Sequence, residues 1–410
     1  MDYIHRSIEA KLIKSESTYK AVLVTGPRQV GKSTLLKKVF EGRRYVSLDD
    51  PFLEQQAQTN GPMFMMLNQP PVIFDEIQRA PELFRYIKIK CDESEEKGLF
   101  CLSGSQQFKL MKNVSETLSG LSLRDMQNDS FNQRFLPTME YVLERQKTAK
   151  EPENIWRIIH RGSYPALQNS DLEWTQFYAD YVRTYIERDV RELSAVQDLN
   201  AFQRFMIAAA ARTGEILNYS NIADEVGKDV STIKNWISIL EASGIIYLLE
   251  PYSAAVLKRA IKSPKLYFRD TGLACYLTRW LTHDALAYGA MNGAMFETFV
   301  ISEILKSFSN VGLDYRYFVS YYRGKDKKKV KASGETVELE REIDFIIEES
   351  GVLYPIEIKK NASATADMTS AFQVLDQIPE KKRSTGAVIC MCPQPGMLRE
   401  NVLQIPVWYI

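Results

Sequence analysis

The feature that most constrains the fold is the stretch AVLVTGPRQVGKST, residues 21–34. Its first four residues are apolar, which is typical of a buried parallel strand. Residues 34–40, TLLKKVF, have helical character. Between them lies the pattern Gly-x4-Gly-Lys-Ser. A glycine-rich loop in this position aims backbone N–H groups at phosphate oxygens, and the helix N-terminus adds the positive end of a dipole. The flanking strand and helix therefore favour a phosphate-binding loop over an ordinary glycine-rich turn.

Two side chains of this loop have defined roles in binding a nucleoside triphosphate. Lys32 is predicted to reach the β- and γ-phosphates, and the hydroxyl of Ser33 is predicted to ligate magnesium. The glycines Gly26 and Gly31 permit the backbone turn on which both contacts depend. We therefore predict ATP and Mg²⁺ as cofactors.

Two later apolar runs predict strands beside the phosphate loop. The run PPVIFDEIQ ends in Asp75 and Glu76, where Asp75 can hold magnesium through water and Glu76 can polarise the attacking water. The run GLFCLSGSQ places Ser103 and Ser105 at a strand end, where either hydroxyl could sense the γ-phosphate. The predicted nucleotide contacts are Gly26, Pro27, Arg28, Gln29, Val30, Gly31, Lys32, Ser33, Thr34 and Ser105.

Four motifs, GPRQVGKST, VIFDEIQ, LSGSQ and DSFNQRFLPT, together resemble the AAA-type P-loop ATPases of bacteria and archaea that carry an uncharacterised C-terminal region. The resemblance continues through YIERDV, ARTGEILNYSNIADEVG and KSPKLYFRDTGLA, so it covers nearly the whole chain. It implies a P-loop fold of the additional-strand class, ATP hydrolysis, and a catalytic glutamate in the second motif, which is Glu76 here.

The chain departs from that family's pattern at one point. Members usually follow the serine-rich strand with a Gly-Arg pair and a short apolar strand, whereas Gly120 leads here straight into LSLRDM. We therefore expect an edge strand of the ATPase sheet to be missing, so the sequence supports ATP binding more firmly than ATP hydrolysis. An arginine finger has three candidates, Arg28, Arg134 and Arg188, and the sequence does not choose among them.

The middle of the chain predicts a helical linker or lid followed by a winged helix-turn-helix. Apolar residues recur at three- and four-residue spacing in FYADYVRTYIERDVREL, which indicates a helix. In NYSNIADEVGKDVSTIKNWISILEASGIIYLLE, a short helix, a turn at Gly227, a second helix and a strand follow one another. The second helix would expose Thr232, Lys234, Asn235 and Ser238, which suit a reader of the major groove and equally suit a plain solvent face.

The next stretch, KSPKLYFRDTGLA, combines a strand with an Asp-Thr-Gly turn that leads into a helix. Asp270 is interpreted as the N-cap of that helix, because its side chain can accept from the first free backbone N–H groups. The stretch is strongly typical of the family, but no chemical role follows from its residues.

Four charged residues near the C-terminus predict a metal site. Glu297 lies on the helix AMFETFVISEILKSF, Asp344 at the head of the strand DFII, and Glu357 and Lys359 at the end of LYPIEIKK. If the two strands pair through EESGV, Asp344 comes to lie beside Glu357, and a divalent cation would relieve the repulsion between their carboxylates. The predicted metal ligands are Ser33 and Asp75 at the ATP site, and Glu297, Asp344 and Glu357 at this second site.

This second arrangement resembles the PD-(D/E)XK nuclease fold, in which a metal-activated water cuts phosphodiester bonds. The proline that usually precedes the aspartate is absent here. The resemblance implies catalytic roles for Asp344, Glu357 and Lys359, in addition to those of Lys32 and Glu76 at the ATP site. The alternative is an inherited fold that holds DNA or a protein partner without cutting.

Composition limits the remaining possibilities. Lysine plus arginine and aspartate plus glutamate both number 52, so no global basic field indicates a nucleic-acid binder. The stretch RGKDKKKVK, residues 323–331, could be a local phosphate-tracking arm or a solvated hairpin tip. The five cysteines form no C-x-x-C pair, and no apolar run approaches membrane-spanning length. We therefore expect a reduced, cytoplasmic protein with no membrane partner.

The 410 residues are long for one core and are expected to form an α/β protein of several modules. They are predicted to comprise an AAA-type P-loop ATPase domain with a central parallel sheet (1–165), a helical linker or lid (166–205), a winged helix-turn-helix (206–285) and a PD-(D/E)XK-like α/β domain (286–410). The expected function is ATP-dependent processing of nucleic acid, with ATP and DNA as partners and a homo-oligomer as one option. The alternatives are a nucleotide switch that does not cut and a regulator that reads a DNA sequence.

Overall fold

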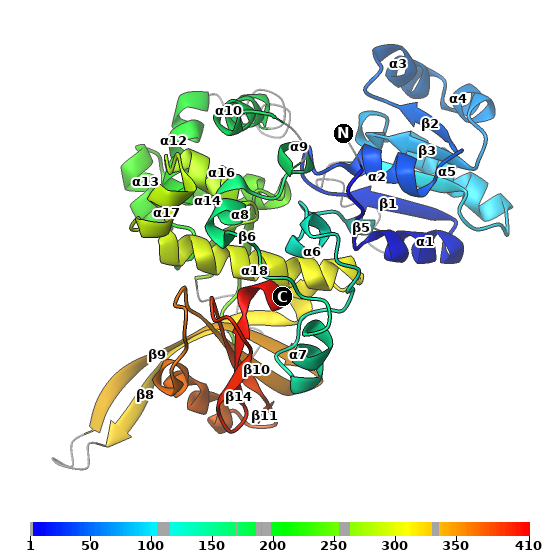
Figure 1. The fold of residues 1–410 in the computed structure, drawn as a ribbon. Coiled ribbons are helices and arrows are strands. Elements are labelled where there is room, and N and C mark those ends of the chain that lie inside the picture. Colours follow the sequence, from blue (N-terminus) through cyan, green and yellow to red (C-terminus); the bar gives the residue numbers. More distant parts are fainter. Residues whose placement is uncertain are drawn as a thin grey trace.

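A five-stranded parallel sheet forms the N-terminal part of the chain (Figure 1). The structure is a computed structural model, and it describes residues 3–104, 115–168, 171–185, 190, 198–253, 263–329 and 336–410. The strands run in the order β2-β3-β4-β1-β5, and neighbouring strands are parallel. Their bounds are β1 Ala21–Thr25, β2 Arg44–Ser47, β3 Val72–Asp75, β4 Phe100–Gly104 and β5 Ser115–Thr117. The predicted central parallel sheet is thus confirmed.

Buried side chains cover both faces of this sheet, which is why its central strands are continuous apolar runs. On one face, Leu23, Phe74 and Leu102 pack with helices α3 to α5 in a cluster of their own. On the other face, Val22 and Ile73 belong to a large core that continues into the rest of the chain. The helical elements of this part are α1 Glu9–Thr18, α2 Lys32–Val39, α3 Pro51–Thr59, α4 Gly61–Leu67, η1 Ile77–Arg79 and α5 Leu83–Glu93.

The edge of the sheet corrects one expectation from the sequence. An edge strand was expected to be missing because Gly120 leads straight into LSLRDM, yet strand β5 lies at that edge and pairs with residues 23–25 of β1. The strand comes before Gly120 rather than after it, and it consists of three residues, Ser115–Thr117. The edge position of the sheet is therefore filled by a short strand whose residues carry no apolar pattern.

Residues 121–149, which were expected to belong to the ATPase domain, pack on the C-terminal part of the chain. The backbone N–H of Leu123 donates to Glu303 Oε2 (2.8 Å), and that of Phe135 donates to Ser307 Oγ (2.9 Å). The buried guanidinium of Arg145 donates to the backbone oxygen of Tyr409 (2.9 Å). Figure 1 shows α6 beside α18 and α7 beside the C-terminal sheet. The helices of this region are α6 Leu123–Met126 and α7 Met139–Arg145, and α8 Ile155–Arg161, α9 Pro165–Gln168 and α10 Trp174–Thr184 follow it.

A helix–turn–helix and a two-stranded hairpin follow one another in the predicted order. The side chains of Asn218 and Asp229 cap α13 and α14, and Gly227 ends α13 in a left-handed conformation. Helix α14 buries Ile233, Trp236, Ile237, Ile239 and Leu240 on one face. The elements are α12 Leu199–Ala210, α13 Tyr219–Val226, α14 Val230–Ala242, β6 Ile246–Leu249, β7 Lys265–Phe268, α16 Thr271–Leu277 and α17 His283–Tyr288.

The C-terminal part is a mixed sheet packed against the long helix α18, Asn292–Asn310. Its strands run in the order β13-β14-β12-β10-β9-β8, and β11 pairs with β10. Strands β9 and β10 form the predicted hairpin, and the β8–β9 ribbon projects away from the body of the molecule (Figure 1). The remaining elements are η3 Tyr315–Tyr317, β8 Val319–Lys329, β9 Thr336–Glu349, β10 Val352–Ile358, η4 Ala366–Gln377, β11 Lys382–Arg383, β12 Gly386–Cys390, β13 Gly396–Arg399, β14 Val402–Pro406 and η5 Val407–Tyr409.

The β6–β7 hairpin is joined directly to the edge of this mixed sheet. Beyond β6, the backbone N–H of Tyr252 donates to the oxygen of Tyr321 in β8, and the N–H of Tyr321 donates back to Glu250 (3.1 Å). The hydroxyl of Tyr321 donates to the backbone oxygen of Ser263, just before β7 (2.6 Å). These hydrogen bonds connect the residues next to β6 and β7 with strand β8 at the edge of the C-terminal sheet. No helix within the described residues is long and apolar enough to cross a membrane.

Candidate functional sites

The phosphate loop has the backbone that its glycines require. Gly26 has a φ of 153°, and a Cβ atom there would lie 2.2 Å from the backbone oxygen of Leu118. Gly31 is left-handed (φ 89°) and precedes α2. The ammonium of Lys32 is buried and donates to the backbone oxygens of Gly26 (3.0 Å) and Pro27 (2.9 Å). The loop therefore encloses the lysine that was predicted to contact phosphate.

Asp75 is the centre of the polar contacts at the end of β3. Its carboxylate accepts from the hydroxyl of Ser33 at 2.7 Å, and also from the hydroxyls of Tyr45 and Ser103. These donors come from α2, β2 and β4, which the parallel sheet brings to one edge. A serine hydroxyl beside an aspartate at a phosphate loop supplies the hard oxygen atoms that Mg²⁺ prefers. Ser33 and Asp75 therefore fit the magnesium ion of a bound MgATP.

Glu76 and the two serines of β4 have different positions. Glu76 is left-handed (φ 56°), and its carboxylate accepts from the side chain of Gln78. Ser103 is fully buried, and its hydroxyl both donates to Asp75 and accepts from the N–H of Glu76 (3.2 Å). Ser103 therefore supports the acidic pair instead of facing a phosphate. Ser105 lies outside the described residues.

The structure tests one of the three arginine-finger candidates, Arg134. The guanidinium of Arg134 forms an ion pair with Glu349 in the C-terminal sheet and lies over the rings of Phe308 and Phe318. That contact excludes Arg134 as an arginine finger for the ATP site of its own chain in this arrangement. Arg188 lies outside the described residues, and Arg28 belongs to the phosphate loop itself.

Sequence analysis missed a buried arginine that fastens the phosphate loop. The guanidinium of Arg6 donates to the backbone oxygen of Val30 (3.1 Å), and on the other side to those of Ser119 (2.8 Å) and Gly120 (3.1 Å). Its Nε lies 3.5 Å from Asp125 Oδ2. Burial acts to raise the pKa of Asp125, but the charge of Arg6 and several hydrogen bonds outweigh it, so this pKa lies below its ordinary value.

Asp270, in the stretch that had no assigned role, connects β7 with residues beside the phosphate loop. It caps α16 through the N–H of Leu273 (2.7 Å), which confirms the predicted N-cap. Its carboxylate also accepts from the backbone N–H (2.6 Å) and hydroxyl (2.8 Å) of Ser163, and from the hydroxyl of Tyr178 (2.7 Å). Pro165, two residues after Ser163, lies beside the phosphate loop. Its Cγ atom is 3.7 Å from the position that a Cβ atom on Gly31 would occupy. Asp270 thus fixes a loop that touches the nucleotide site.

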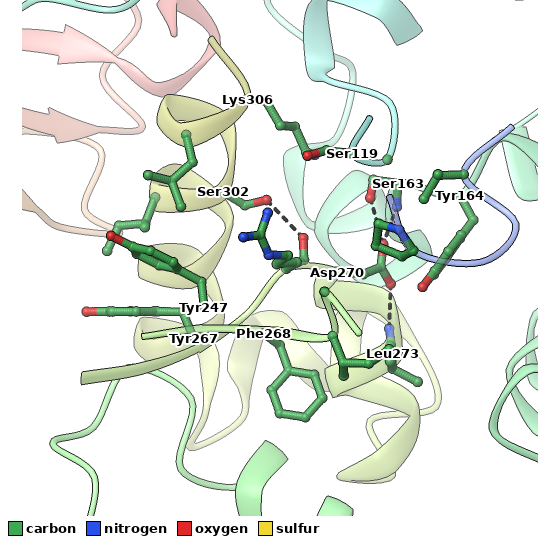
Figure 2. A pocket seen from close by; sticks show the side chains of 18 residues that line it. Ser119, Ser163, Tyr164, Tyr247, Tyr267, Phe268, Asp270, Leu273, Ser302 and Lys306 are labelled. Atoms are coloured by element: carbon green, nitrogen blue, oxygen red, sulfur yellow. Dashed lines mark hydrogen bonds between the residues drawn. The ribbon is translucent and has the colours of Figure 1, made fainter. Parts of the chain in front are cut away.

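A small cavity lies at this junction (Figure 2). Its volume is about 30 Å³, and its wall includes Pro27 of the phosphate loop, Ser163, Asp270, and Ser302 and Lys306 of α18. Figure 2 shows the dashed contacts from Ser163 and Leu273 to Asp270. A space of this size accommodates one or two water molecules rather than a nucleotide. The cavity therefore lies where the phosphate loop, the loop at Ser163 and helix α18 meet.

The predicted acidic residues converge in the C-terminal part. Strand pairing matches Ile356 with Phe345, so the next position brings Asp344 opposite Glu357. The ammonium of Lys359 bridges them, 2.8 Å from Asp344 Oδ2 and 2.7 Å from Glu357 Oε2. The backbone N–H of Ile358 also donates to Asp344 (2.9 Å).

Burial and mutual repulsion raise the pKa values of two of these carboxyl groups. Burial, and then the charge of Asp344, raise the pKa of Glu357 to about 9 and that of Glu297 to about 7. For Lys359, burial acts to lower the pKa, but the carboxylates of Asp344 and Glu357 outweigh it and keep the ammonium charged. Glu357 Oε1 is buried and has no hydrogen-bond partner.

Two residues of this site were missed, and both come from the hairpin strand β7. The ammonium of Lys265 lies 3.6 Å from Glu297 Oε1 and 2.6 Å from Glu342 Oε1. The hydroxyl of Tyr267 donates to the same oxygen of Glu297 (2.6 Å). The sequence signal existed, since both residues belong to KSPKLYFRDTGLA, but nothing in the sequence placed this stretch beside Glu297.

The fit of a divalent cation can be judged from these atoms. Within the described residues, no three His, Cys, Asp or Glu side chains lie close enough together to hold a metal ion. Glu297 is contacted by Lys265 and Tyr267, whereas Lys359 bridges Asp344 and Glu357. Mg²⁺ needs only one or two protein carboxylates beside water and substrate phosphate. Asp344 and Glu357, with its unpartnered oxygen, fit that requirement.

Comparison with known proteins assigns families to three parts of the chain. Residues 18–131 match the AAA domain family. Residues 152–284 match a domain of unknown function (DUF8612), and residues 335–410 match another (DUF4143). With its strand order and phosphate loop, the N-terminal part is an AAA-type P-loop ATPase domain, a class that binds and hydrolyses ATP.

Similar proteins are found in bacteria and archaea. An uncharacterized protein of Mycobacterium tuberculosis is 24% identical over 373 residues, which is 90% of this chain and 77% of that protein. An uncharacterized protein of Methanocaldococcus jannaschii is 21% identical over 222 residues, 53% of this chain and 44% of that protein. Among solved structures, a Walker-type ATPase of Pyrococcus abyssi is 14% identical with a TM-score of 0.36, covering 67% of this chain and 96% of that chain.

Proposed function

We propose that the protein hydrolyses ATP and that the nucleotide state controls a phosphodiester-cutting site for DNA in the C-terminal domain. The observation that carries the proposal is the convergence of Asp344, Glu357 and Lys359 at one end of paired strands, with Glu357 Oε1 buried and unpartnered. A buried acceptor without a donor is costly unless a ligand completes it. ATP hydrolysis in the AAA domain would supply the free energy for this control. The contacts of Asp270 with Ser163 would connect the nucleotide site with the acidic site.

At the ATP site, the residues would act as follows. Lys32 would exchange the oxygens of Gly26 and Pro27 for oxygens of the β- and γ-phosphates. Glu76 would accept a proton from the water that attacks the γ-phosphorus. Magnesium held by Ser33 and Asp75 would neutralise charge that develops on the phosphates.

We further propose that residues 206–285 form the predicted winged helix-turn-helix and that it contacts DNA. Helix α14 would be its second helix and β6–β7 its wing. Lys234, Asn235 and Ser238 are exposed on α14, as a groove-contacting face requires. Thr232 is less suited, because it is partly buried and its hydroxyl donates to the capping residue Asp229 (2.6 Å).

At the acidic site, Asp344 and Glu357 would hold a divalent cation, which when bound activates water and stabilises the pentavalent phosphate. Lys359 would give up one carboxylate and donate to a phosphate oxygen or orient the attacking water. The N–H of Ile358 would keep Asp344 in place during this exchange.

A second candidate function is an ATP switch that does not cut. It is favoured by the same ion pairs, because Lys359 already pairs with Asp344 and Glu357. Lys265 likewise pairs with Glu297. In that case the C-terminal sheet would bind DNA or a protein partner, and this binding would require bound ATP.

The experiment combines two assays on the full chain. ATP hydrolysis and cleavage of linear, circular and branched DNA are measured in Mg²⁺ and Mn²⁺, with and without ATP. Wild type is compared with Lys32→Ala and Asp344→Asn. Asp376→Asn is the matched control, since it removes an acid of the same module that pairs with Arg383 at the surface.

The outcomes separate the candidates. Cleavage that disappears in Asp344→Asn but not in Asp376→Asn supports the nuclease, and its response to Lys32→Ala tells whether ATP controls it. If no substrate is cut by any variant while ATP is hydrolysed, the cutting site is rejected. ATP-dependent DNA binding without cleavage then supports the switch.

A further inference from the structure

Two side chains of strand β7, those of Lys265 and Tyr267, contact Glu297 on helix α18. Lys265 directly follows Pro264 in the stretch KSPK, and its side chain is only 4% exposed.

 Lys265 is the first residue of β7, where its backbone pairs with Leu249 of β6. Its ammonium contacts Glu297 and Glu342, and the hydroxyl of Tyr267 donates to the Glu297 oxygen that faces Lys265. The acidic site is therefore assembled from two modules.

We infer that Lys265 is a built-in counter-cation of the acidic site, and that Lys265 and Tyr267 together keep the Glu297 carboxylate from a divalent cation held by Asp344 and Glu357. This inference rests on the proposed metal site. Lys265 and Tyr267 are positioning residues, since they act through Glu297. Glu297 becomes a third ligand only when β7 releases it.

The charges around the site support this assignment. Four carboxylates, those of Glu297, Glu342, Asp344 and Glu357, face two ammonium groups, those of Lys265 and Lys359. The carboxylates outnumber the ammonium groups, so the site has more acceptor oxygens than its two lysines can occupy, which favours a cation. A lysine close to a carboxylate competes with a cation for the same oxygen lone pairs.

The position of Lys265 is fixed by backbone as well as by charge. The N–H of Leu266 donates to the oxygen of Glu215 (2.9 Å), and that of Leu217 donates to the oxygen of Pro264 (2.8 Å). Lys265 also pairs with Ile216 in an isolated bridge. A movement of β7 relative to α18 would therefore withdraw Lys265 and Tyr267 from Glu297 as one unit.

The test is a Mn²⁺ titration of the full chain without nucleotide. Binding is monitored by electron paramagnetic resonance, in which the signal of free Mn²⁺ decreases as the ion binds. The measured quantity is the Kd of the component that Asp344→Asn removes. We expect Lys265→Met to tighten it about tenfold and Tyr267→Phe, which changes no charge, to tighten it about threefold. Lys265→Arg keeps the charge and should stay within twofold of wild type.

Lys306→Met is the matched control. Lys306 is also a buried lysine, ion-paired with Glu303 on the same helix as Glu297 (2.7 Å), so its loss reports the general effect of removing a buried positive charge. Thermal unfolding of each variant establishes that it is folded before its Kd is compared.

The possible results are distinct. If Lys265→Met binds Mn²⁺ no more tightly than Lys306→Met, and Tyr267→Phe equals wild type, the counter-cation assignment is overturned while the metal site stands. If Asp344→Asn changes Mn²⁺ binding in neither the wild-type nor the Lys265→Met background, the metal site itself is rejected, and the present inference with it.

Discussion

The nucleotide site and the acidic site both place a carboxylate among polar groups, but they satisfy it differently. Asp75 accepts from three hydroxyl groups, all within the N-terminal sheet and its helix. Glu357 shares Lys359 with Asp344 and keeps one buried oxygen without a partner. The donors to Asp75 all come from the N-terminal sheet and α2, whereas the acidic site takes groups from β7 as well as from α18 and the C-terminal sheet. A site of the second kind can respond to a change in the position of β7.

The largest effect is expected for Lys32→Ala, which should reduce the rate of ATP hydrolysis about 10³-fold, because a charge that stabilises the transition state is removed. A phosphate-release assay measures it. Lys38→Ala is the control, since Lys38 lies on the same helix with its side chain 48% exposed. If the two sites are separate without nucleotide, Lys32→Ala leaves the Mn²⁺ affinity of the acidic site unchanged. A shift in that affinity would contradict the separation.

A buried carboxylate with all its partners should show the pH dependence of a stabilising group. Asp125 has a lowered pKa, so its contribution is present above its ordinary pKa and is lost as the pH falls through the lowered one. We expect Asp125→Asn to lower the free energy of unfolding by about 3 kcal/mol at pH 7 and by less at pH 3. Denaturant unfolding at both pH values measures this. An equal loss at both would show that the Arg6 pair is not the cause.

The connection between the two sites can be cut at Asp270. Asp270→Asn keeps the shape but turns one acceptor into a donor that faces Ser163 or Tyr178. We expect a loss of about 2 kcal/mol in the free energy of unfolding and a weaker response of the acidic site to ATP. Thermal unfolding and the Mn²⁺ titration with and without ATP measure the two effects. Asp284→Asn is the control, because that side chain is 77% exposed. An unchanged response to ATP would mean that the connection runs elsewhere.

The smallest effect is expected at Tyr45. Tyr45→Phe removes one of the three hydroxyl donors to Asp75 and should cost about 1 kcal/mol, which is about fivefold in kcat/KM for ATP. Tyr19→Phe is the control, since Tyr19 is exposed at the surface of the same domain. If Tyr45→Phe lowers activity as much as Lys32→Ala does, Asp75 depends on this one donor and is not the well-satisfied group described above.

The two sites also differ in how well the sequence predicted them. The phosphate loop, Asp75 and Glu76 belong to local motifs, because a strand followed by a turn fixes their positions within a few residues. Tyr45 was missed, since β2 carries no motif and its neighbour β3 is known only from the fold. Arg6 was missed because its partners, Val30 and Ser119, are distant in sequence.

The acidic site was predicted in part. Alternation and the hairpin placed Asp344 beside Glu357 and Lys359, since strand pairing is a short-range property here. Lys265 and Tyr267 could not be placed, because their contact with Glu297 depends on how the hairpin and α18 pack, and periodicity does not report such packing. The prediction that Glu297 is a third metal ligand stays a prediction, since in this structure Lys265 and Tyr267 contact its carboxylate.

The stretch from Lys265 to Asp270 touches the acidic site at one end and a loop beside the phosphate site at the other. Two ligands that act on one such stretch obey thermodynamic reciprocity: if ATP changes the affinity for the cation by some factor, the cation changes the affinity for ATP by the same factor. Saturating the acidic site with Mn²⁺ should therefore shift the Kd of ATP in the direction, and to the extent, that ATP shifts the Kd of Mn²⁺. Any ligand that draws the cation into place would then act as an effector of the distant nucleotide site.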